Sequence, residues 1–201
     1  MRAFTLGRSS RPTYEFMGIL IDEGASHLID LRDENKYRPS SSREKNLNAY
    51  MRGNGIKRIV GLERIFSVSD PYLLDRLQSG ASVSYVNGKS RYDVSELMEA
   101  VWGQMDRGRK PTLAIIGGDR EPSGCIRSVW ISKGLSNEGV EVRHIIDRER
   151  AIGHEAMEKW LMTRYGEPLS GARAYCDARF MRAAYEMHAK YLVKTAVTGR
   201  R

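Results

Sequence analysis

The residues best suited to chemistry lie between Thr112 and Ser128, in the stretch TLAIIGGDREPSGCIRS. It brings together a carboxylic acid at Asp119, a thiol at Cys125 and a guanidinium at Arg127. A carboxylic acid can move protons or hold a ribose hydroxyl, a thiol can act as a nucleophile, and an arginine can bind an anion. These residue types indicate a site, although they do not name a reaction.

Local pattern predicts how this stretch is built. Residues 113–116 form an apolar run without a polar break, which indicates a buried strand, and a pair of glycines ends it. Pro122 and Ser123 suit the first turn of a helix, where a missing N–H costs nothing and a hydroxyl can cap. Free N–H groups and the positive end of the helix dipole would then favour an anion. The residues expected in those first turns are Cys125, Arg127 and Ser128.

This stretch resembles a segment of a bacterial and archaeal family catalogued as domain-of-unknown-function family four-eight-eight. The family pattern places an acidic residue before a proline and then Cys-His-Arg. Asp119, Pro122, Cys125 and Arg127 match that pattern, whereas Ile126 stands in the place of the histidine. Gly117 stands where the family often has a second cysteine.

Two further segments carry the resemblance. Family members begin with a strand followed by Gly-His-Ser, and here Arg8 replaces the histidine while Ser9 is retained. Asp30 and Arg32 match the ends of the family's Asp-Val-Arg. The resemblance covers about residues 1–146 and implies an α/β architecture, but the family's function is itself not established.

Alternation of strands and helices predicts the fold. The sequence predicts an α/β, three-layer protein with a mostly parallel sheet of about five strands, flavodoxin-like or Rossmann-like. Residues 1–148 would form the α/β domain, and residues 149–201 a C-terminal helical extension. The expected strands are 3–7, 27–31, 56–60, 113–116 and 140–145; the expected C-terminal helices are 151–164 and about 172–196.

In such sheets, loops at the carboxyl ends of the strands form the ligand crevice. We therefore expect an anion-binding crevice for a phosphate, sulfate or nucleotide-sized ligand. Asp30 and Arg32 either belong to this crevice or form a structural ion pair with each other. Cys125 is either a nucleophilic or redox residue or an inert buried thiol. The candidate residues are Arg8, Ser9, Asp30, Arg32, Asp119, Cys125, Arg127 and Ser128.

The net charge of +8 favours phosphate-bearing partners, either a small molecule or nucleic acid. Residues 150–201 contain ten Lys or Arg and five Asp or Glu, so they contribute +5 of that charge. The alternative is a solvated basic surface.

Several classes of protein are not indicated. Two cysteines and four histidines make neither a disulfide framework nor a metal site with defensible spacing. No cofactor-binding motif is present, so we expect no cofactor.

No apolar run reaches the length of a membrane span and no signal pattern opens the chain, which predicts a cytoplasmic protein that does not act at a membrane.

The last long helix carries a stripe whose members are spaced alternately by four and three residues. Either the stripe packs on its own domain, with His188 a packed histidine, or it pairs with a second copy in a homodimer. The stripe consists of Ala174, Ala178, Met181, Tyr185, His188 and Leu192.

Two function classes remain from the sequence. The first is an enzyme acting on a nucleotide or nucleic-acid base, with Asp119 and Cys125 as its candidate catalytic residues. The alternative is a non-catalytic nucleic-acid-binding protein, which the positive charge favours.

Overall fold

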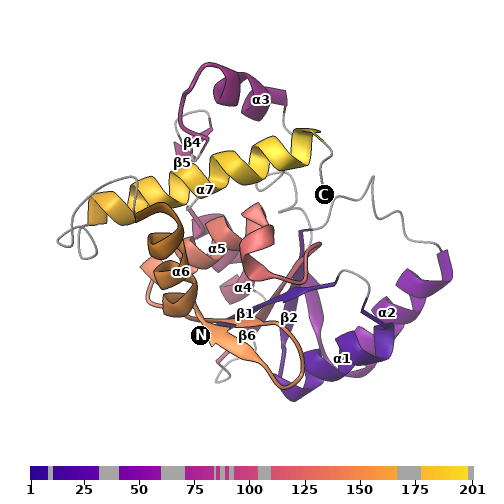
Figure 1. Ribbon diagram of the computed structural model, residues 1–201. Coiled ribbons are helices and arrows are strands. Elements are labelled where there is room, and N and C mark those ends of the chain that lie inside the picture. The colour runs from indigo at the N-terminus through magenta and orange to yellow at the C-terminus, as the bar shows by residue number, and fades with distance from the viewer. Residues whose placement is uncertain are drawn as a thin grey trace.

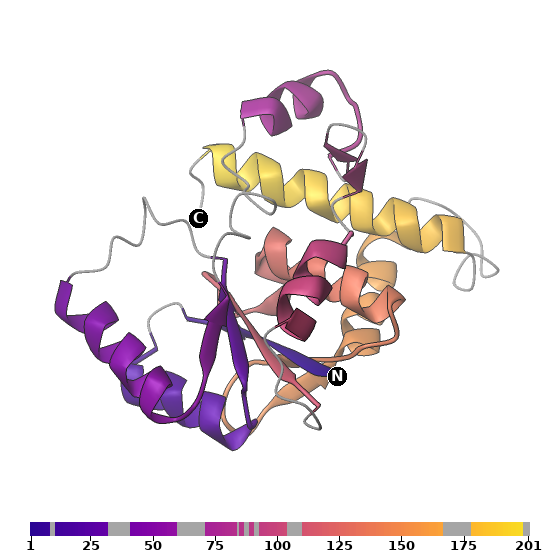
Figure 2. The same ribbon diagram turned by 180° about the vertical axis from the view of Figure 1, so that it is seen from behind.

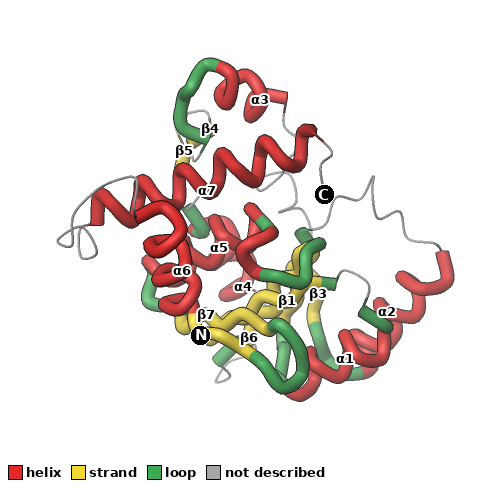
Figure 3. The backbone as a smooth tube through the Cα atoms, viewed as in Figure 1, coloured by secondary structure: helices red, strands yellow, loops and turns green. Residues whose placement is uncertain are grey.

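A six-stranded sheet forms the centre of the protein (Figure 3). The computed structural model describes residues 1–8, 11–31, 41–59, 71–83, 85–86, 89–90, 93–103, 110–166 and 178–198. In the described chain the strand order is β3-β2-β6-β1-β7-β8, with the first five parallel and β8 antiparallel to β7. The strands are β1 (Arg2–Gly7), β2 (His27–Asp30), β3 (Lys57–Ile59), β6 (Thr112–Gly117), β7 (Glu141–Ile145) and β8 (Ala151–Gly153).

Helices cover both faces of this sheet, so the predicted three-layer α/β fold of the flavodoxin or Rossmann type is confirmed (Figures 1 and 2). One face carries α1 (Thr13–Asp22) and α2 (Ser41–Gly53), and the other carries α4 (Ser95–Gly103) and α5 (Ile126–Asn137). Beyond α5 lie α6 (His154–Gly166) and α7 (Ala178–Thr198). The remaining elements are α3 (Pro71–Gln78), a small hairpin of β4 (Tyr85–Val86) and β5 (Lys89–Ser90), and the short 3-10 helix η1 (Pro122–Gly124).

Strands β1 and β6 lie side by side at the middle of the sheet, in register from Arg2 with Thr112 to Gly7 with Gly117. From β1 the chain continues through α1 to β2 on one side, whereas from β6 it continues through α5 to β7 on the other. Their carboxyl ends therefore form the switch point at which α/β proteins place ligands.

Residues after 149 add both a strand and helices. Strand β8 was not predicted, because residues 151–153 were assigned to the start of a helix. They pair instead with β7, from Arg143 with Gly153 to Ile145 with Ala151. The connecting turn, Asp147-Arg148-Glu149-Arg150, contains neither glycine nor proline, so the sequence offered no hairpin signal there.

Helix α7 packs on α6, α5 and α3 of its own chain (Figure 1). Tyr185, His188 and Leu192 of the expected stripe are buried there, while Ala178 is exposed and Ala174 lies outside the described residues. Packing on its own domain is therefore what covers this stripe in the part of the chain that is described. A homodimer stays a prediction, and it would have to form through a surface other than this stripe.

Among the described residues, no helix combines the length and the apolar character needed to cross a bilayer. The expected cytoplasmic location stays a prediction.

Candidate functional site

The loops that follow β1 and β6 touch at the carboxyl end of the sheet. The Arg8 backbone N–H donates to the Gly117 carbonyl at 3.0 Å. Gly7 lies so close beneath the second loop that an added Cβ would sit 1.8 Å from the Asp119 carbonyl oxygen. Two of the three loops expected to meet therefore do so, and the third, residues 32–40, lies outside the described part.

The side-chain contacts given for Arg8 and Asp30 are with α1 and β3. The Arg8 guanidinium lies 4.7 Å from the Phe16 ring centroid and 3.5 Å from the Thr13 hydroxyl, so it turns onto α1. The Asp30 carboxylate lies 3.8 Å from Arg58 of β3. The rest of the expected arginine set stays a prediction. Outside the description lie Ser9, Arg32 and the side chains of Arg127 and Ser128.

The arginine that braces the turn after β1 is Arg11, which sequence reasoning passed over. Its buried side chain donates from Nε to the Gly7 carbonyl at 2.8 Å and also to the Ile146 carbonyl beyond β7. It pairs with Glu15 at 2.5 Å. A guanidinium here is structural, because it satisfies carbonyl groups at the ends of two neighbouring strands.

Cys125 lies at the junction of two helical segments. The predicted helix start at Pro122 is a 3-10 turn, and α5 begins only at Ile126. Cys125 has an extended backbone between them and is 8% exposed. The junction does place the thiol at the beginning of a helix, but its burial favours the inert alternative over a nucleophilic or redox role.

Slow thiol–disulfide exchange at Cys125 is the expected result of that burial. In a Cys176→Ser background, the native protein should react with a small disulfide reagent at least about tenfold more slowly than the urea-unfolded chain, because buried thiols are shielded. Absorbance of the released thiol follows the reaction. A native rate equal to that of a free model thiol would restore Cys125 as a candidate nucleophile.

A pocket of about 430 Å³ opens beside the β6–α5 loop. Its sheet side is lined by Asp119 and Ser123 of the β6–α5 loop, and its helix side by ring-bearing residues of α6 and α7. One wall therefore comes from the loop that the sequence predicted, and the other from helices that it did not connect to the site. The lining consists of Asp119, Glu121, Ser123, Gly124, Trp160, Arg164, His188, Tyr191, Leu192 and Thr195.

Arg164 stands at the centre of the aromatic wall. Its guanidinium carbon lies 5.4 Å from the Trp160 ring centroid, 5.2 Å from that of Tyr191 and 5.7 Å from that of Tyr165. Trp160 and Tyr191 remain 39% and 47% exposed, although both are large rings. We call Trp160, Arg164 and Tyr191 the aromatic platform, since the guanidinium lies over both rings and all three residues line the pocket.

His188 fixes the platform to the loop. Its Nε2 lies 2.8 Å from the Ser123 carbonyl and its Nδ1 lies 2.9 Å from the Tyr165 hydroxyl. The ring also stacks on Tyr191 at an interplanar angle of 18°. Burial lowers the pKa of His188, so the neutral ring donates to Ser123 and accepts from Tyr165. The expectation that His188 is a packed histidine is confirmed by its burial and these bonds.

A buried polar chain links the sheet to the helices of the pocket, and no sequence pattern had pointed to it. Four hydrogen bonds run from β1 to α6: Thr5 Oγ1 to His144 Nδ1 at 2.7 Å, His144 Nε2 to His154 Nδ1 at 3.1 Å, His154 Nε2 to Tyr185 Oη at 2.9 Å, and Tyr185 Oη to Glu158 Oε1 at 3.3 Å. Lys133 donates to the same Glu158 oxygen at 2.7 Å. We call this set the histidine relay.

When both histidine rings are neutral, the hydrogen bonds of the histidine relay can all be donated in the same direction along the chain of residues. Glu158 accepts from Tyr185, so the tyrosine oxygen accepts from His154 Nε2–H, and His154 Nδ1 accepts from His144 Nε2–H. Burial, followed by the charge of Lys133, lowers the pKa of His154 to about 4. Burial, followed by His154, lowers that of His144 to about 3. The relay is therefore uncharged at its histidines near neutral pH and ties α6 and α7 to β1 and β7.

Among the described residues, no group of three or more His, Cys, Asp or Glu side chains could hold a metal ion.

No protein-family model matches this sequence, and neither a curated protein nor a solved structure matches it. The resemblance to family four-eight-eight stays a prediction.

Proposed function

We propose that the pocket beside the central strand binds the base of a nucleotide. The observation that carries this proposal is the aromatic platform, whose exposed Trp160 and Tyr191 flank a guanidinium at the wall of a pocket of about 430 Å³. Aromatic faces and arginine planes stack on any base, and pockets of this size suit small ligands.

The carboxylates of the pocket favour particular bases. Asp119 and Glu121 line the same pocket as the platform. A carboxylate accepts hydrogen bonds, so it matches a base edge that carries an exocyclic amino group, or it holds a ribose hydroxyl. With Asp119 as the group that moves a proton, the protein is an enzyme acting on a nucleotide or a nucleic-acid base. Among the described lining residues, Arg164 is the cation that can bind the phosphate.

Loss of one platform ring should weaken nucleotide binding. Calorimetric titration with the four common nucleoside monophosphates is expected to show binding of those with an exocyclic amino group. Replacing Trp160 by alanine should reduce affinity by about tenfold, since stacking contributes about 1–3 kcal/mol per base. Trp102→Ala is the matched control, because Trp102 is a similarly exposed tryptophan on α4 that is not among the described residues lining the pocket. Equal losses in both variants, or no binding by the native protein, would contradict the proposal.

The catalytic part of the proposal rests on Asp119. Asp119→Asn preserves the size of the side chain and removes its charge, so it should abolish turnover of a bound nucleotide while the platform still binds it. Chromatography of nucleotides after incubation with the native protein measures turnover. If the native protein leaves the nucleotide unchanged, the catalytic part of the proposal is wrong and the protein only binds nucleotides.

A non-catalytic nucleic-acid-binding protein is the second candidate, favoured by the net charge of +8 and by the exposure of the platform rings. Affinity for single-stranded and duplex DNA, measured against salt concentration, separates the two candidates. A steep salt slope that persists in Asp119→Asn favours the nucleic-acid binder, because that slope counts released counterions.

A further inference from the structure

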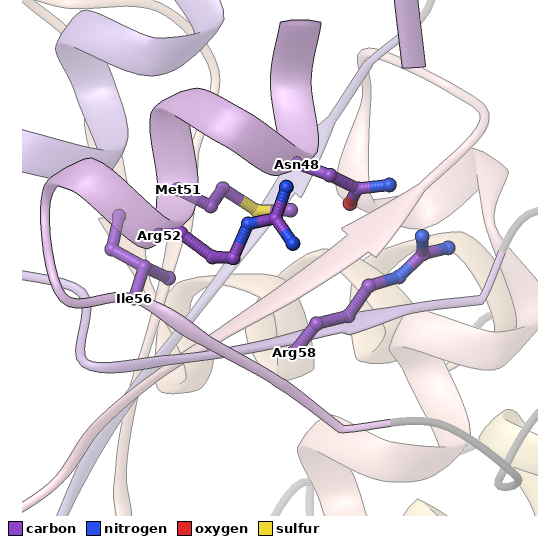
Figure 4. Close-up of a pocket in the computed structure, with 5 residues that line it drawn as sticks. All are labelled: Asn48, Met51, Arg52, Ile56 and Arg58. Carbon is purple, nitrogen blue, oxygen red and sulfur yellow. The ribbon is translucent and has the colours of Figure 1, made fainter. Parts of the chain in front are cut away.

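A second pocket, of about 320 Å³, lies between α2 and β3 (Figure 4). It is on the opposite side of the sheet from the pocket that the aromatic platform lines. Its lining is Asn48, Met51, Arg52, Ile56 and Arg58. Met51 and Ile56 are 2% and 4% exposed, so they form an apolar floor. Among the described lining residues, the polar groups above that floor are two guanidinium groups and one carboxamide, which are largely hydrogen-bond donors.

The two arginines come from different elements and face the same space (Figure 4). Arg58 stands on β3, where the Asp30 carboxylate lies 3.8 Å away. Arg52 leaves the last turn of α2, and no described residue forms an ion pair with its guanidinium. Two guanidinium groups therefore stand in the described lining of one pocket, where their positive charge attracts an anion.

We propose that this pocket binds the phosphate group of a small phosphomonoester or inorganic phosphate. Guanidinium groups form paired hydrogen bonds with phosphate oxygens, and the Asn48 carboxamide adds a neutral donor. The described lining of the proposed nucleotide site contains two carboxylates, whereas the described residues that line this pocket include none. The proposal therefore assigns a separate anion site and does not depend on the aromatic platform.

Titration with inorganic phosphate at constant ionic strength tests the site, followed by NMR of the arginine side-chain N–H groups. The native protein should show saturable shifts. Arg52→Gln should weaken phosphate affinity by at least about tenfold, since charge-assisted hydrogen bonds are lost. Arg52 is exposed and is not paired with a described residue, so this variant should fold normally. Circular dichroism checks that point.

Lys57→Gln is the control for general electrostatics. It removes one positive charge at the neighbouring position of β3, on the face opposite to Arg58, and should change phosphate affinity less than about twofold. Equal weakening by both substitutions, or the absence of saturable shifts at about 10 mM phosphate, would overturn the proposal. Binding of a single-stranded oligonucleotide that Arg52→Gln abolishes, without any binding of phosphate, would also overturn it in favour of a nucleic-acid contact.

Discussion

Acidification below pH 6.5 is expected to destabilise the protein steeply, by about 1.4 kcal/mol per pH unit for each histidine of the relay. The pKa of His144 falls from 6.5 to about 3 and that of His154 to about 4 on folding. Between pH 6.5 and 4 the unfolded chain therefore binds up to two more protons at these positions than the folded protein does. The stabilising contribution is complete above pH 6.5 and is lost as the pH falls.

The surroundings of the relay explain why the folded protein resists these protons. His144 and His154 are buried, and a charged imidazole there would lose its hydration and its acceptor nitrogen. Lys133 of α5 adds repulsion at His154, whereas Glu158 of α6 lies 3.8 Å from the His154 ring and provides the facing carboxylate. Among the described residues, Tyr185 of α7 is a further titratable group that contacts His154.

Urea unfolding curves recorded from pH 8 to pH 5 measure this dependence. His144→Gln keeps a polar side chain but removes one titrating ring, so its free energy of unfolding should be lower at neutral pH and fall less steeply below pH 6.5. Chemical shifts of the histidine rings provide an independent reading of protonation. Identical slopes in the native and variant proteins would contradict the role assigned to His144.

Replacing Gly7 by alanine is expected to cost more than about 3 kcal/mol of folding free energy, because the new methyl would overlap the chain backbone. Its Cβ would lie 1.8 Å from the Asp119 carbonyl oxygen and 2.6 Å from the Arg120 Cα. Neither atom belongs to a flexible side chain. Relief requires the β6–α5 loop to move away from β1, which would also displace Asp119 from the pocket.

Gly153 offers the matched control. It also ends a strand of the sheet, yet an alanine Cβ there meets nothing within 4 Å. Gly153→Ala should therefore change stability by less than about 1 kcal/mol. Thermal and urea unfolding of the two variants against the native protein provide the measurement. A Gly7→Ala protein as stable as Gly153→Ala would show that the two loops do not approach in this way.

Local patterns in the sequence were sufficient for the fold class. The apolar run at residues 113–116 is fully buried in β6, and the alternation with amphipathic segments predicted a parallel sheet covered on both faces. This success has a physical reason, since burial on both faces demands continuous apolar strands. Boundaries were less determined: α5 begins at Ile126, after a 3-10 turn that the Pro122 signal did not distinguish from a full helix.

One wall of the candidate site also followed from the sequence, because loops at the carboxyl ends of neighbouring strands must lie near one another. Asp119 lines the pocket as a member of such a loop. The direction of each side chain did not follow. Arg8 turns onto α1, and Arg11 takes the structural role in its turn, because a guanidinium on a short loop can reach several carbonyl groups.

Tertiary structure alone decided the other wall of the pocket and the histidine relay. Trp160 and Arg164 lie one helical turn apart, a spacing that fits a buried stripe as well as an exposed one. Their outward face depends on how α6 packs against α5 and α7. Thr5 and His144 are separated by 139 positions and meet only because β7 pairs with β1. Long-range packing fixes such contacts, and local sequence patterns do not encode them.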